Sequence, residues 1–473
     1  MGSLPHPLLH WRHKNRLYYR DLDRLHRWLI PPGLRVLEIG SGTGILLDQV
    51  QPAFGVGIDE DAEAITLAQV TFPQLHFRVQ DAQELDLTHL DLEGCDQPFD
   101  VVILSNLIGG LKDIQVVLER LRPVCSPQTR LVITYHNPIW EPILAVASWW
   151  GQRMPLPEAN WLSRRDVSNL LELAGFETIR WGKRLLLPRG IPLLSNWINR
   201  WIAPLPGINA LCVTEYLVAR PQPGAILPSD RSLQPSVSVV IPARNEAGNI
   251  LNCVQTLPEM GSHTEIIFVE GNSTDQTWAE IQRVQALLQG QRDIKSWQQR
   301  GRGKADAVRL GFGQATGDIL IILDADLTVK ADDMPKFFAA VASGRCDMAN
   351  GCRLVYPLSG ETMPGLNRWA NRFFAALLSY ILGIRIKDSL CGTKVLRRQD
   401  YLTIAAHRHI FGDFDPFGDF DLLLGAVKQN LKIMDIPVRY YPRVYGQSNI
   451  AHVREGLKLL GICGFAARRF RFF

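Results

Sequence analysis

The sequence predicts an α/β protein built from two doubly wound domains, because three features of its 473 residues agree. Short β-branched runs alternate with helical patterns in both halves, which is typical of parallel sheets flanked by helices. A segment rich in proline and polar residues separates the halves, and the length is too great for one ordinary domain. We therefore expect a first domain at residues 1–220, a linker at 221–236 and a second domain at 237–473.

Composition excludes several classes of protein. Hydrophobic residues make up 46% and charged residues 21%, as in a globular protein, and the net charge of +4 gives no reason to expect a nucleic-acid partner. The eight cysteines form no C-x-x-C pair, which argues against a zinc site and fits a reducing compartment. No signal peptide and no apolar run of about 20 residues is found. We expect a cytoplasmic protein, either soluble or held peripherally on the inner face of the membrane.

The first half is expected to contain five strands, with the sequences RVLEI, FGVGID, LHFRV, FDVVILS and RLVITY. The first strand runs into Gly40, Gly42 and Gly44, which precede a helical segment. Glycines are needed where a strand turns sharply into a helix and the backbone must approach a ligand closely. Taken alone, this loop fits either a nucleotide site or a tight turn.

Three acidic residues narrow the choice of ligand. Glu38 lies just before the glycines, Asp59 ends the second strand, and Asp81 follows the third. Such folds use an acid at the end of the second strand to hold ribose hydroxyls, and Asp81 is well placed to accept from an adenine amino group. A dinucleotide needs its pyrophosphate at the helix N-terminus, which an acid at Glu38 opposes. The acids therefore favour a cofactor that carries positive charge and no phosphate.

The motifs LEIGSGTG, GVGID, QDAQEL and FDVVILSNLI together resemble those of class I methyltransferases. The resemblance covers about residues 30–140 and implies that the three glycines and three acids bind S-adenosyl-L-methionine. His136, after the fifth strand, could act as a general base, although its position favours a hydrogen-bonded loop histidine. The stretch 140–211 is rich in Trp, Pro and Leu, and we expect it to cap the substrate side and to suit an apolar or lipid-linked acceptor.

The second half is expected to form strands with the sequences VSVVIPA, EIIFVE, DILIILDAD and CDMANG. The third of these ends in Asp324 and Asp326, and acidic residues also follow the first two strands, at Glu246 and Glu270. Acids at the carboxyl ends of successive parallel strands indicate a ligand crevice. Two carboxylates one residue apart can present oxygens to Mg²⁺ or Mn²⁺, which in turn binds a diphosphate. Lys304 lies in a Gly-containing turn without the P-loop spacing, so an NTPase is excluded.

The motifs VSVVIPARNE, FVEGNSTDQT, GKADAV, DADLT, NGCR, DSLCGTK and RVYGQSN resemble family 2 glycosyltransferases with a GT-A fold. They are most similar to the dolichyl- or polyprenyl-phosphate sugar transferases. The resemblance implies a donor linked to UDP or GDP and an acceptor that is a polyprenyl phosphate or a glycan. It assigns nucleoside contacts to Pro242, Arg244, Glu246 and Glu270, metal and diphosphate contacts to Asp324 and Asp326, and phosphate contacts to Lys304, Arg353, Lys394 and Arg443.

Two departures from this family leave the donor base and the metal ligands open. Glu270-Gly271 stands where the family often has paired aspartates, and Thr328 stands where a stronger metal ligand is often found. For deprotonation of an acceptor hydroxyl, the resemblance points to Asp419 or Asp421. A polyprenyl phosphate is already ionised and needs no base, so these carboxylates would then be positioning or structural residues.

The C-terminal segment GLKLLGICGFAARRFRFF alternates apolar and basic residues, which is typical of a helix on an anionic bilayer or of one docked on its own domain. The interpretation that the whole sequence favours is a bifunctional enzyme. In the main alternative, the glycosyltransferase is active and the first domain binds S-adenosyl-L-methionine without turnover. A non-catalytic scaffold would be expected to lose an acid of the D-x-D, and a nucleotidyltransferase would have a Gly-rich loop after residue 241.

Overall fold

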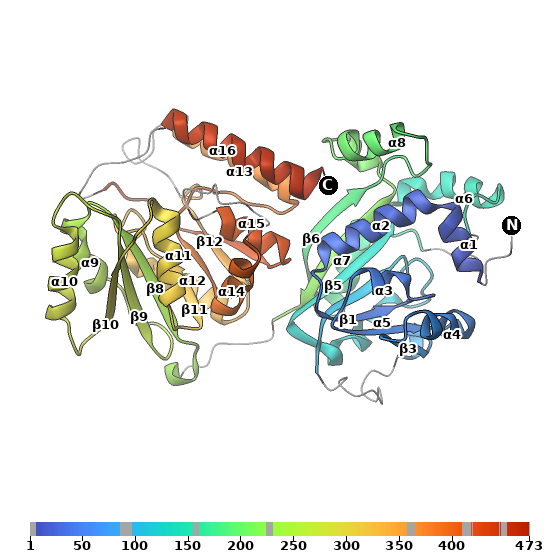
Figure 1. Cartoon of the computed structure of the whole chain (residues 1–473), viewed down its shortest axis with the longest axis horizontal. Coiled ribbons are helices and arrows are strands. Elements are labelled where there is room, and N and C mark those ends of the chain that lie inside the picture. The colour runs from blue at the N-terminus through green and yellow to red at the C-terminus, as the bar shows by residue number, and fades with distance from the viewer. Residues whose placement is uncertain are drawn as a thin grey trace. The chain divides into compact units, whose positions relative to one another are not determined.

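A computed structural model of the chain describes residues 6–85, 97–154, 160–223, 230–356, 365–408, 418, 420–443, 445 and 452–472. The chain divides into two compact units after Gln222. Figure 1 shows the first unit from blue to green and the second from yellow-green to red, each with a sheet covered by helices. The two units are described separately below.

The first unit contains a seven-stranded sheet in the order β3-β2-β1-β4-β5-β7-β6. Strands β1 and β4 are parallel neighbours, and the strand order reverses between them, which places a ligand crevice at their carboxyl ends. In chain order the main elements are α1 (Pro7–Lys14), α2 (Arg16–Leu29), β1 (Arg35–Ile39), α3 (Ile45–Gln49), β2 (Phe54–Asp59), α4 (Ala62–Thr71), β3 (His76–Val79), η1 (Ala82–Glu84), β4 (Phe99–Ser105), α5 (Ile114–Arg120), β5 (Cys125–His136), η3 (Pro138–Trp140), α6 (Glu141–Trp149), α7 (Arg164–Leu173), β6 (Phe176–Arg184), α8 (Leu194–Trp197), η4 (Ile198–Ile202), η5 (Ile208–Leu211) and β7 (Thr214–Pro221).

Apolar side chains cover both faces of this sheet. Helices α2, α3 and α4 pack on one face through residues such as Leu25, Leu47 and Ile65. Helices α5 and α7 pack on the other through residues such as Val117 and Leu171. Strands buried on both faces read as continuous apolar runs, which is why the five expected strands were recognisable in the sequence.

The second unit also contains a seven-stranded sheet, in the order β10-β9-β8-β11-β13-β12-β14. Its strand order reverses between the parallel neighbours β8 and β11, so the carboxyl ends of these two strands flank the crevice. In chain order the main elements are β8 (Val237–Ala243), η7 (Ala247–Asn249), α9 (Ile250–Gln255), β9 (Thr264–Glu270), α10 (Thr277–Leu287), β10 (Asp293–Gln298), α11 (Lys304–Gln314), β11 (Ile319–Ile322), α12 (Met334–Ala342), β12 (Met348–Cys352), α13 (Gly365–Leu382), β13 (Lys394–Arg397), α14 (Arg398–Ala406), α15 (Phe420–Lys428), β14 (Ile433–Pro437), α16 (His452–Ala466) and η10 (Ala467–Arg471).

The expectation of parallel sheets is wrong in two places. Strand β7 runs antiparallel between β5 and β6, and β13 runs antiparallel between β11 and β12. Strand β6 also lies within 140–211, so part of the segment expected to cap the substrate side extends the sheet instead. Both strands contain charged residues that interrupt the apolar pattern although they are buried, Glu215 and Arg220 in β7 and Lys394 in β13. Strand β7 continues to Pro221, at the start of the segment expected to be a linker.

Helices α13 and α16 pack against each other in the second unit, as Figure 1 shows. The inner side of α13 buries Leu378 and Leu382, whereas its Trp369 is 73% exposed. On α16, Leu459 and Ile462 are buried and Leu457 is 67% exposed. Within the described residues, neither these helices nor any other is long and apolar enough to cross a membrane.

Candidate functional sites

The glycine loop after β1 is shaped so that side chains would not fit. Gly40, Gly42 and Gly44 all have positive φ, at 75°, 50° and 76°. A Cβ atom on Gly44 would lie 2.5 Å from Cζ of Phe77, and one on Gly40 would lie 2.9 Å from Cδ1 of Leu107. Both the conformation and the close packing therefore require glycine. The backbone N–H groups of Gly40 and Gly44 bond within the protein, to the oxygens of Ile58 and Ser41.

Two carboxylates lie beside this loop. Glu38, in β1, is 2% exposed, and its Oε2 has no hydrogen-bond partner. Burial raises its pKa well above the usual value, and the charge of Asp59 acts in the same direction. The charge of Arg12 and a backbone hydrogen bond from Leu47 act in the opposite direction. A buried carboxyl group whose Oε2 has no hydrogen-bond partner fits a ligand that brings positive charge. Asp59, at the end of β2, accepts a hydrogen bond from the backbone N–H of Gly42 at 2.7 Å and so fixes the loop.

The third acid predicted for this site, Asp81, lies at the end of the neighbouring strand. It is exposed and caps η1 by accepting from the backbone N–H of Gln83 at 2.8 Å. Glu38 near the end of β1, Asp59 at the end of β2 and Asp81 just after β3 therefore lie at one edge of the sheet. This arrangement, with the glycine loop, fits S-adenosyl-L-methionine, since Glu38 has a carboxylate oxygen without a partner beside the loop and Asp81 is an exposed acid on the neighbouring strand end.

His136 ends β5 at the same edge, among aromatic rings. It stacks on Tyr18 with ring centroids 5.7 Å apart and planes 6° apart, and Trp161 lies at 6.4 Å. The Tyr18 hydroxyl donates to Oδ1 of Asn106 at 3.0 Å. Burial, together with the nearby charge of Arg153, lowers the pKa of His136 to about 3. The imidazole is therefore neutral near pH 7, and it is a weak base because it has little affinity for a proton.

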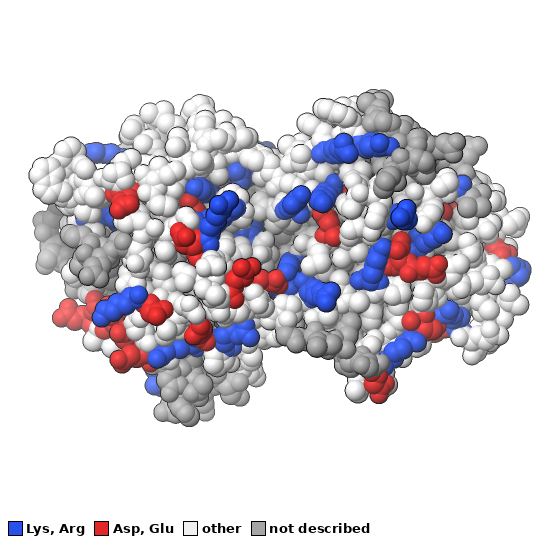
Figure 2. Space-filling view, turned by 180° about the vertical axis from the view of Figure 1, so that it is seen from behind, with Lys and Arg blue, Asp and Glu red and all other residues white. Residues whose placement is uncertain are grey.

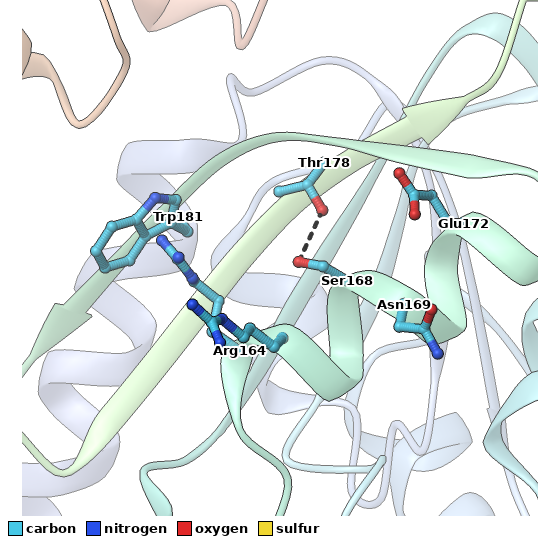
Figure 3. A pocket seen from close by; sticks show the side chains of 7 residues that line it. Arg164, Ser168, Asn169, Glu172, Thr178 and Trp181 are labelled. Carbon is cyan, nitrogen blue, oxygen red and sulfur yellow. Dashed lines mark hydrogen bonds between the residues drawn. The ribbon is translucent and has the colours of Figure 1, made fainter.

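A surface hollow of the first unit lies away from these groups. It is formed by α7 and the edge strand β6, and Figure 3 shows Ser168 and Thr178 meeting across it at 3.3 Å. Arg164 lies over the ring of Trp181 at 4.1 Å. None of the residues predicted to bind cofactor or substrate lines this hollow.

In the second unit, Glu246, Asp326 and Arg443 meet at the crevice between β8 and β11. Arg443 donates to Oε1 of Glu246 at 3.2 Å and to Oδ2 of Asp326 at 2.6 Å. Burial raises the pKa of Glu246, against the opposing effects of Asn249 and Arg443. Tyr445 packs on Gly248, where a Cβ atom would lie 2.6 Å from its Cδ2. The segment after β14 thus lies against the turn that follows β8.

The other acid of the D-x-D, Asp324, is held among cations. Nζ of Lys304, at the start of α11, lies 2.6 Å from Oδ1 of Asp324. Burial acts in the opposite direction, but Lys304, with Arg353 and Lys394, holds the pKa of Asp324 below its usual value. A Cβ atom on Gly392 would lie 2.2 Å from both Oδ2 of Asp324 and Nζ of Lys304. The backbone at Gly392 therefore packs directly on this ion pair.

These carboxylates form a donor set suited to a metal that also binds a diphosphate. Among the described residues, no group of three or more His, Cys, Asp or Glu side chains converges as a complete metal site. Mg²⁺ and Mn²⁺ bound with nucleotides commonly take one or two protein carboxylates, with phosphate and water oxygens completing the shell. Asp324 and Asp326 can supply this share, and the adjacent cations can neutralise phosphate charge.

Other predicted residues make contacts within the protein. Arg353 forms a bidentate pair with Asp388, at 2.8 and 2.9 Å, and Asp388 is fully buried. Lys394 is fully buried and donates to the backbone oxygen of Cys391. Glu270 accepts from the backbone N–H of Ser273 at 2.5 Å. Pro242 lies half-buried at the end of β8, and the next turn leaves Arg244 exposed.

The two candidate bases fall outside the site or outside the described residues. Asp421, in α15, is 3% exposed and pairs with Arg309 at 3.1 Å and with Arg408 at 3.4 Å. Asp419 lies outside the described residues. Thr328, the family departure beside the D-x-D, donates its hydroxyl to Oδ1 of Asp326 at 2.9 Å. It orients that carboxylate in this structure.

Sequence reasoning missed several residues of both sites. Asp388 and Gly392 both lie in the quoted motif DSLCGTK, but nothing in that motif indicated that they would hold Arg353 and Asp324. Asn106 directly follows β4 at the crevice edge, a position that could have suggested it. Arg153 had no sequence signal, because its place depends on the turn after α6.

Each half of the chain matches a known family. Residues 10–180 match the model described as a methyltransferase domain, and residues 238–404 match the model of glycosyl transferase family 2. The chain thus contains a methyltransferase domain followed by a family 2 glycosyltransferase domain. The two α/β sheets belong to these domains, a Rossmann-like sheet in the first and a GT-A sheet in the second.

Curated relatives match the second domain. The low-salt glycan biosynthesis hexosyltransferase Agl6 of Haloferax volcanii is 28% identical over 239 residues, which cover 49% of this chain and 54% of that protein. The dolichol-phosphate mannosyltransferase of Pyrococcus furiosus is 27% identical over 220 residues, 45% of this chain and 59% of that protein. The chain therefore spans just over half the length of these relatives. A magnesium protoporphyrin IX methyltransferase from Synechocystis with bound SAH aligns over 46% of this chain and 89% of its own, with 16% identity and a TM-score of 0.30.

Proposed function

We propose that this chain is a bifunctional enzyme. Its second domain transfers a sugar, with inversion, from a UDP- or GDP-linked donor to a polyprenyl phosphate or a glycan, with Mg²⁺ or Mn²⁺. Its first domain transfers a methyl group from S-adenosyl-L-methionine. The observation that carries the proposal is the crevice between β8 and β11, where Asp324 and Asp326 lie beside Lys304 and Arg443.

This cluster suits the departure of a nucleoside diphosphate. Charge develops on the diphosphate as the bond to the sugar breaks, and cations already in place stabilise it without rearrangement. A metal held by Asp324 and Asp326 would supply further charge to the same oxygens. Because Arg443 contacts Glu246 and Asp326 in this structure, we propose that it moves onto donor phosphate when the donor binds.

The acceptor is proposed from the relatives and from Asp421. One relative is named as a dolichol-phosphate mannosyltransferase and others as undecaprenyl-phosphate transferases, which indicates a lipid phosphate. A phosphate oxygen is already ionised and attacks without a base. Asp421 fits this scheme as a positioning residue, since its carboxylate is buried against Arg309 and Arg408.

A donor panel tests the glycosyltransferase. Release of UDP or GDP from nucleotide sugars would be measured with Mn²⁺ or Mg²⁺, with and without polyprenyl phosphate, for the parent chain, Asp326→Asn and Asp421→Asn. We expect Asp326→Asn to reduce release by about a hundredfold or more, as loss of a main transition-state contact does. Asp421→Asn should retain most of the activity with polyprenyl phosphate. No release or transfer with any donor would refute the proposal, and equal losses in both variants would refute the roles assigned.

The methyl acceptor is proposed from what surrounds His136. With a pKa of about 3, this imidazole would be a weak base, and burial raises the pKa of the neighbouring Tyr18. Arg153 lies close enough to both tyrosines at this edge, Tyr18 and Tyr19, to interact with them, and it has no carboxylate partner among the described residues. We therefore propose an acceptor with an ionised oxygen, which needs no base and can pair with Arg153.

The low pKa of His136 also supports a second candidate function, in which the first domain binds S-adenosyl-L-methionine without turnover. The weak basicity of His136 favours it, because acceptors that need deprotonation would not react. Calorimetry with S-adenosyl-L-methionine, followed by assay of S-adenosyl-homocysteine release with extracts containing lipid-linked sugars, separates the two. Tight binding without release in any extract would support the binding module, and release that falls on Arg153→Gln would support the enzyme.

We also propose that the C-terminal helix contributes a peripheral membrane contact. Leu457 and Leu460 are 67% and 47% exposed on α16, and Trp369 and Phe373 are exposed on the adjoining α13. Arg468, Arg469 and Arg471 follow in η10. Exposed apolar side chains with neighbouring arginines suit a bilayer surface, which is where a lipid phosphate would be found.

A further inference from the structure

The connection between β6 and β7, residues 185–213, turns polar side chains inward. Asn199 both accepts from the backbone N–H of Leu187 and donates to its oxygen, each at 2.8 Å. Asn209 donates to the backbone oxygen of Lys183 at 3.0 Å, and Ser195 is 2% exposed. Amide and hydroxyl groups therefore make hydrogen bonds on the inner side of this segment. In most surface segments the inner side carries apolar side chains instead.

Large apolar side chains of the same connection face outward. Leu193 is the most prominent, because it is 88% exposed and has a φ of 60°, a backbone conformation that costs free energy for a residue with a branched side chain. Folding gains nothing from holding a leucine in this way. The other exposed large apolar residues of the connection are Ile191, Leu194, Trp197, Trp201 and Leu211.

This surface continues onto η3 and α6. The indole N–H of Trp140 donates to the backbone oxygen of Leu211 at 2.7 Å, which joins the two segments. Beyond that link, Ile143, Trp149 and Trp150 are all exposed. Strands β5 and β6 both run antiparallel to β7, so the segments that follow them lie at the same edge of the sheet. In Figure 2 the lobe at the upper left, which carries α8, is covered largely by uncharged atoms.

Positive charge borders this apolar surface. Residues 184–211 contain three arginines and no aspartate or glutamate. Arg184 pairs with Asp21 at 2.9 Å. Burial lowers the pKa of Arg24, the charge of Asp21 raises it, and the charges of Arg184, Arg20 and Arg200 lower it further. Arginines therefore outnumber carboxylates here, because Asp21 already pairs with Arg184. Phosphate groups could bind this excess positive charge.

We propose that the surface formed by 185–213 with η3 and α6, here called the aromatic edge, docks the methyltransferase domain on an anionic lipid bilayer. Tryptophan and leucine side chains at such a boundary enter the acyl region while arginines remain at the headgroups. The aromatic edge contains one acid, Glu141, so it offers little repulsion to phosphate headgroups, whereas a protein partner would have to bring both acids for the arginines and a matching apolar face. The docking does not depend on either transfer reaction.

The test is binding of the full chain to vesicles. Flotation would compare vesicles of phosphatidylcholine alone with vesicles containing phosphatidylglycerol, using a chain that carries Leu457→Ser and Leu460→Ser so that α16 contributes little. Leu193→Gly with Trp197→Ser removes apolar contact, and Arg189→Gln with Arg200→Gln removes charge. The matched control is Leu173→Ser, at a residue 59% exposed at the end of α7 and outside the aromatic edge. Thermal unfolding of each variant checks that the fold is retained.

We expect the parent chain to bind anionic vesicles more tightly than neutral ones and to release them at high salt. The apolar pair should weaken binding by about ten- to a hundredfold, since each side chain loses roughly 1 kcal/mol or more of burial. The charge pair should weaken binding to anionic vesicles by about fivefold per arginine. Leu173→Ser should leave it unchanged. Undiminished binding by the apolar pair, equal binding to both vesicle types, or self-association in place of vesicle binding would overturn the proposal.

Discussion

Gly44 allows the packing of the glycine loop to be tested quantitatively. In Gly44→Ala the new Cβ would meet Cζ of Phe77 at 2.5 Å, and the residue would keep a φ of 76°. Gly33 is the matched control, because it has a similar φ of 81° but nothing within 4 Å of its Cβ position. The two substitutions share the conformational cost and differ in the steric one.

The expected magnitudes follow from these two terms. A left-handed conformation costs an alanine about 1–2 kcal/mol, which its stiffer unfolded chain offsets by about 0.4–1 kcal/mol. Gly33→Ala should therefore destabilise the first unit by about 1 kcal/mol. Overpacking adds about 1–3 kcal/mol at Gly44, for a total of roughly 2–4 kcal/mol. For a unit of this size the unfolding temperature would fall by roughly 4–16 °C, compared with about 2–4 °C for the control.

Scanning calorimetry measures the unfolding temperatures of Gly44→Ala and Gly33→Ala. The transition that Gly33→Ala displaces is assigned to the first unit. A double variant, Gly44→Ala with Phe77→Leu, removes the facing ring and should recover about 1–2 kcal/mol relative to the sum of the single changes. If Gly44→Ala cost no more than Gly33→Ala, or if the double variant showed no coupling, the steric reasoning would be refuted.

Three further predictions concern pH, cofactor and the ion pair. Burial lowers the pKa of His26 to about 4, so the unfolded state binds more protons between about pH 6.5 and 4, and His26 should lower stability by about 3 kcal/mol as pH decreases through that window. In calorimetry His26→Gln should remove this contribution and leave the similar contribution of His136, whose pKa is lowered to about 3. Asp59→Asn loses the charged acceptor of the loop amide and should weaken S-adenosyl-L-methionine binding by about tenfold or more; unchanged affinity in titration calorimetry would contradict it. Gly392→Ala should displace Asp324 from Lys304 and reduce donor hydrolysis by about a hundredfold, with unchanged hydrolysis as the contrary result.

The fold class was predictable because the central strands are buried on both faces. Strands β1, β4, β8 and β11 read as apolar runs, and the glycines and acids that follow them mark their carboxyl ends. The antiparallel strands β7 and β13 were not recognised as strands of these sheets. Their direction depends on which neighbours they pair with, and a local pattern carries no information about a pairing partner.

For the candidate site residues too, the sequence predicted some positions correctly but could not predict their charged partners. Asp324 and Asp326 were predicted from their position after a buried strand, and the structure places them in the crevice. Arg353 and Asp421 come from equally recognisable motifs, yet their charges are taken up by Asp388 and by Arg309 with Arg408. Whether a charged side chain reaches a ligand depends on which opposite charge lies nearest. Asp388 is 35 positions from Arg353, and Arg309 is 112 positions from Asp421.

The sequence by itself determined that the chain carries two α/β domains, one with a glycine loop and acids and one with a D-x-D, because these features arise from contiguous residues at strand ends. Tertiary structure decided the remainder. It brought Arg443 to Asp326, placed Gly392 on the pair of Asp324 and Lys304, and buried Glu38 with its Oε2 left without a hydrogen-bond partner. It also turned the apolar residues of 185–213 outward, an arrangement that composition suggested but could not orient. The physical reason is that ion pairing, burial and exposure are properties of neighbours in space, and packing of distant segments selects those neighbours.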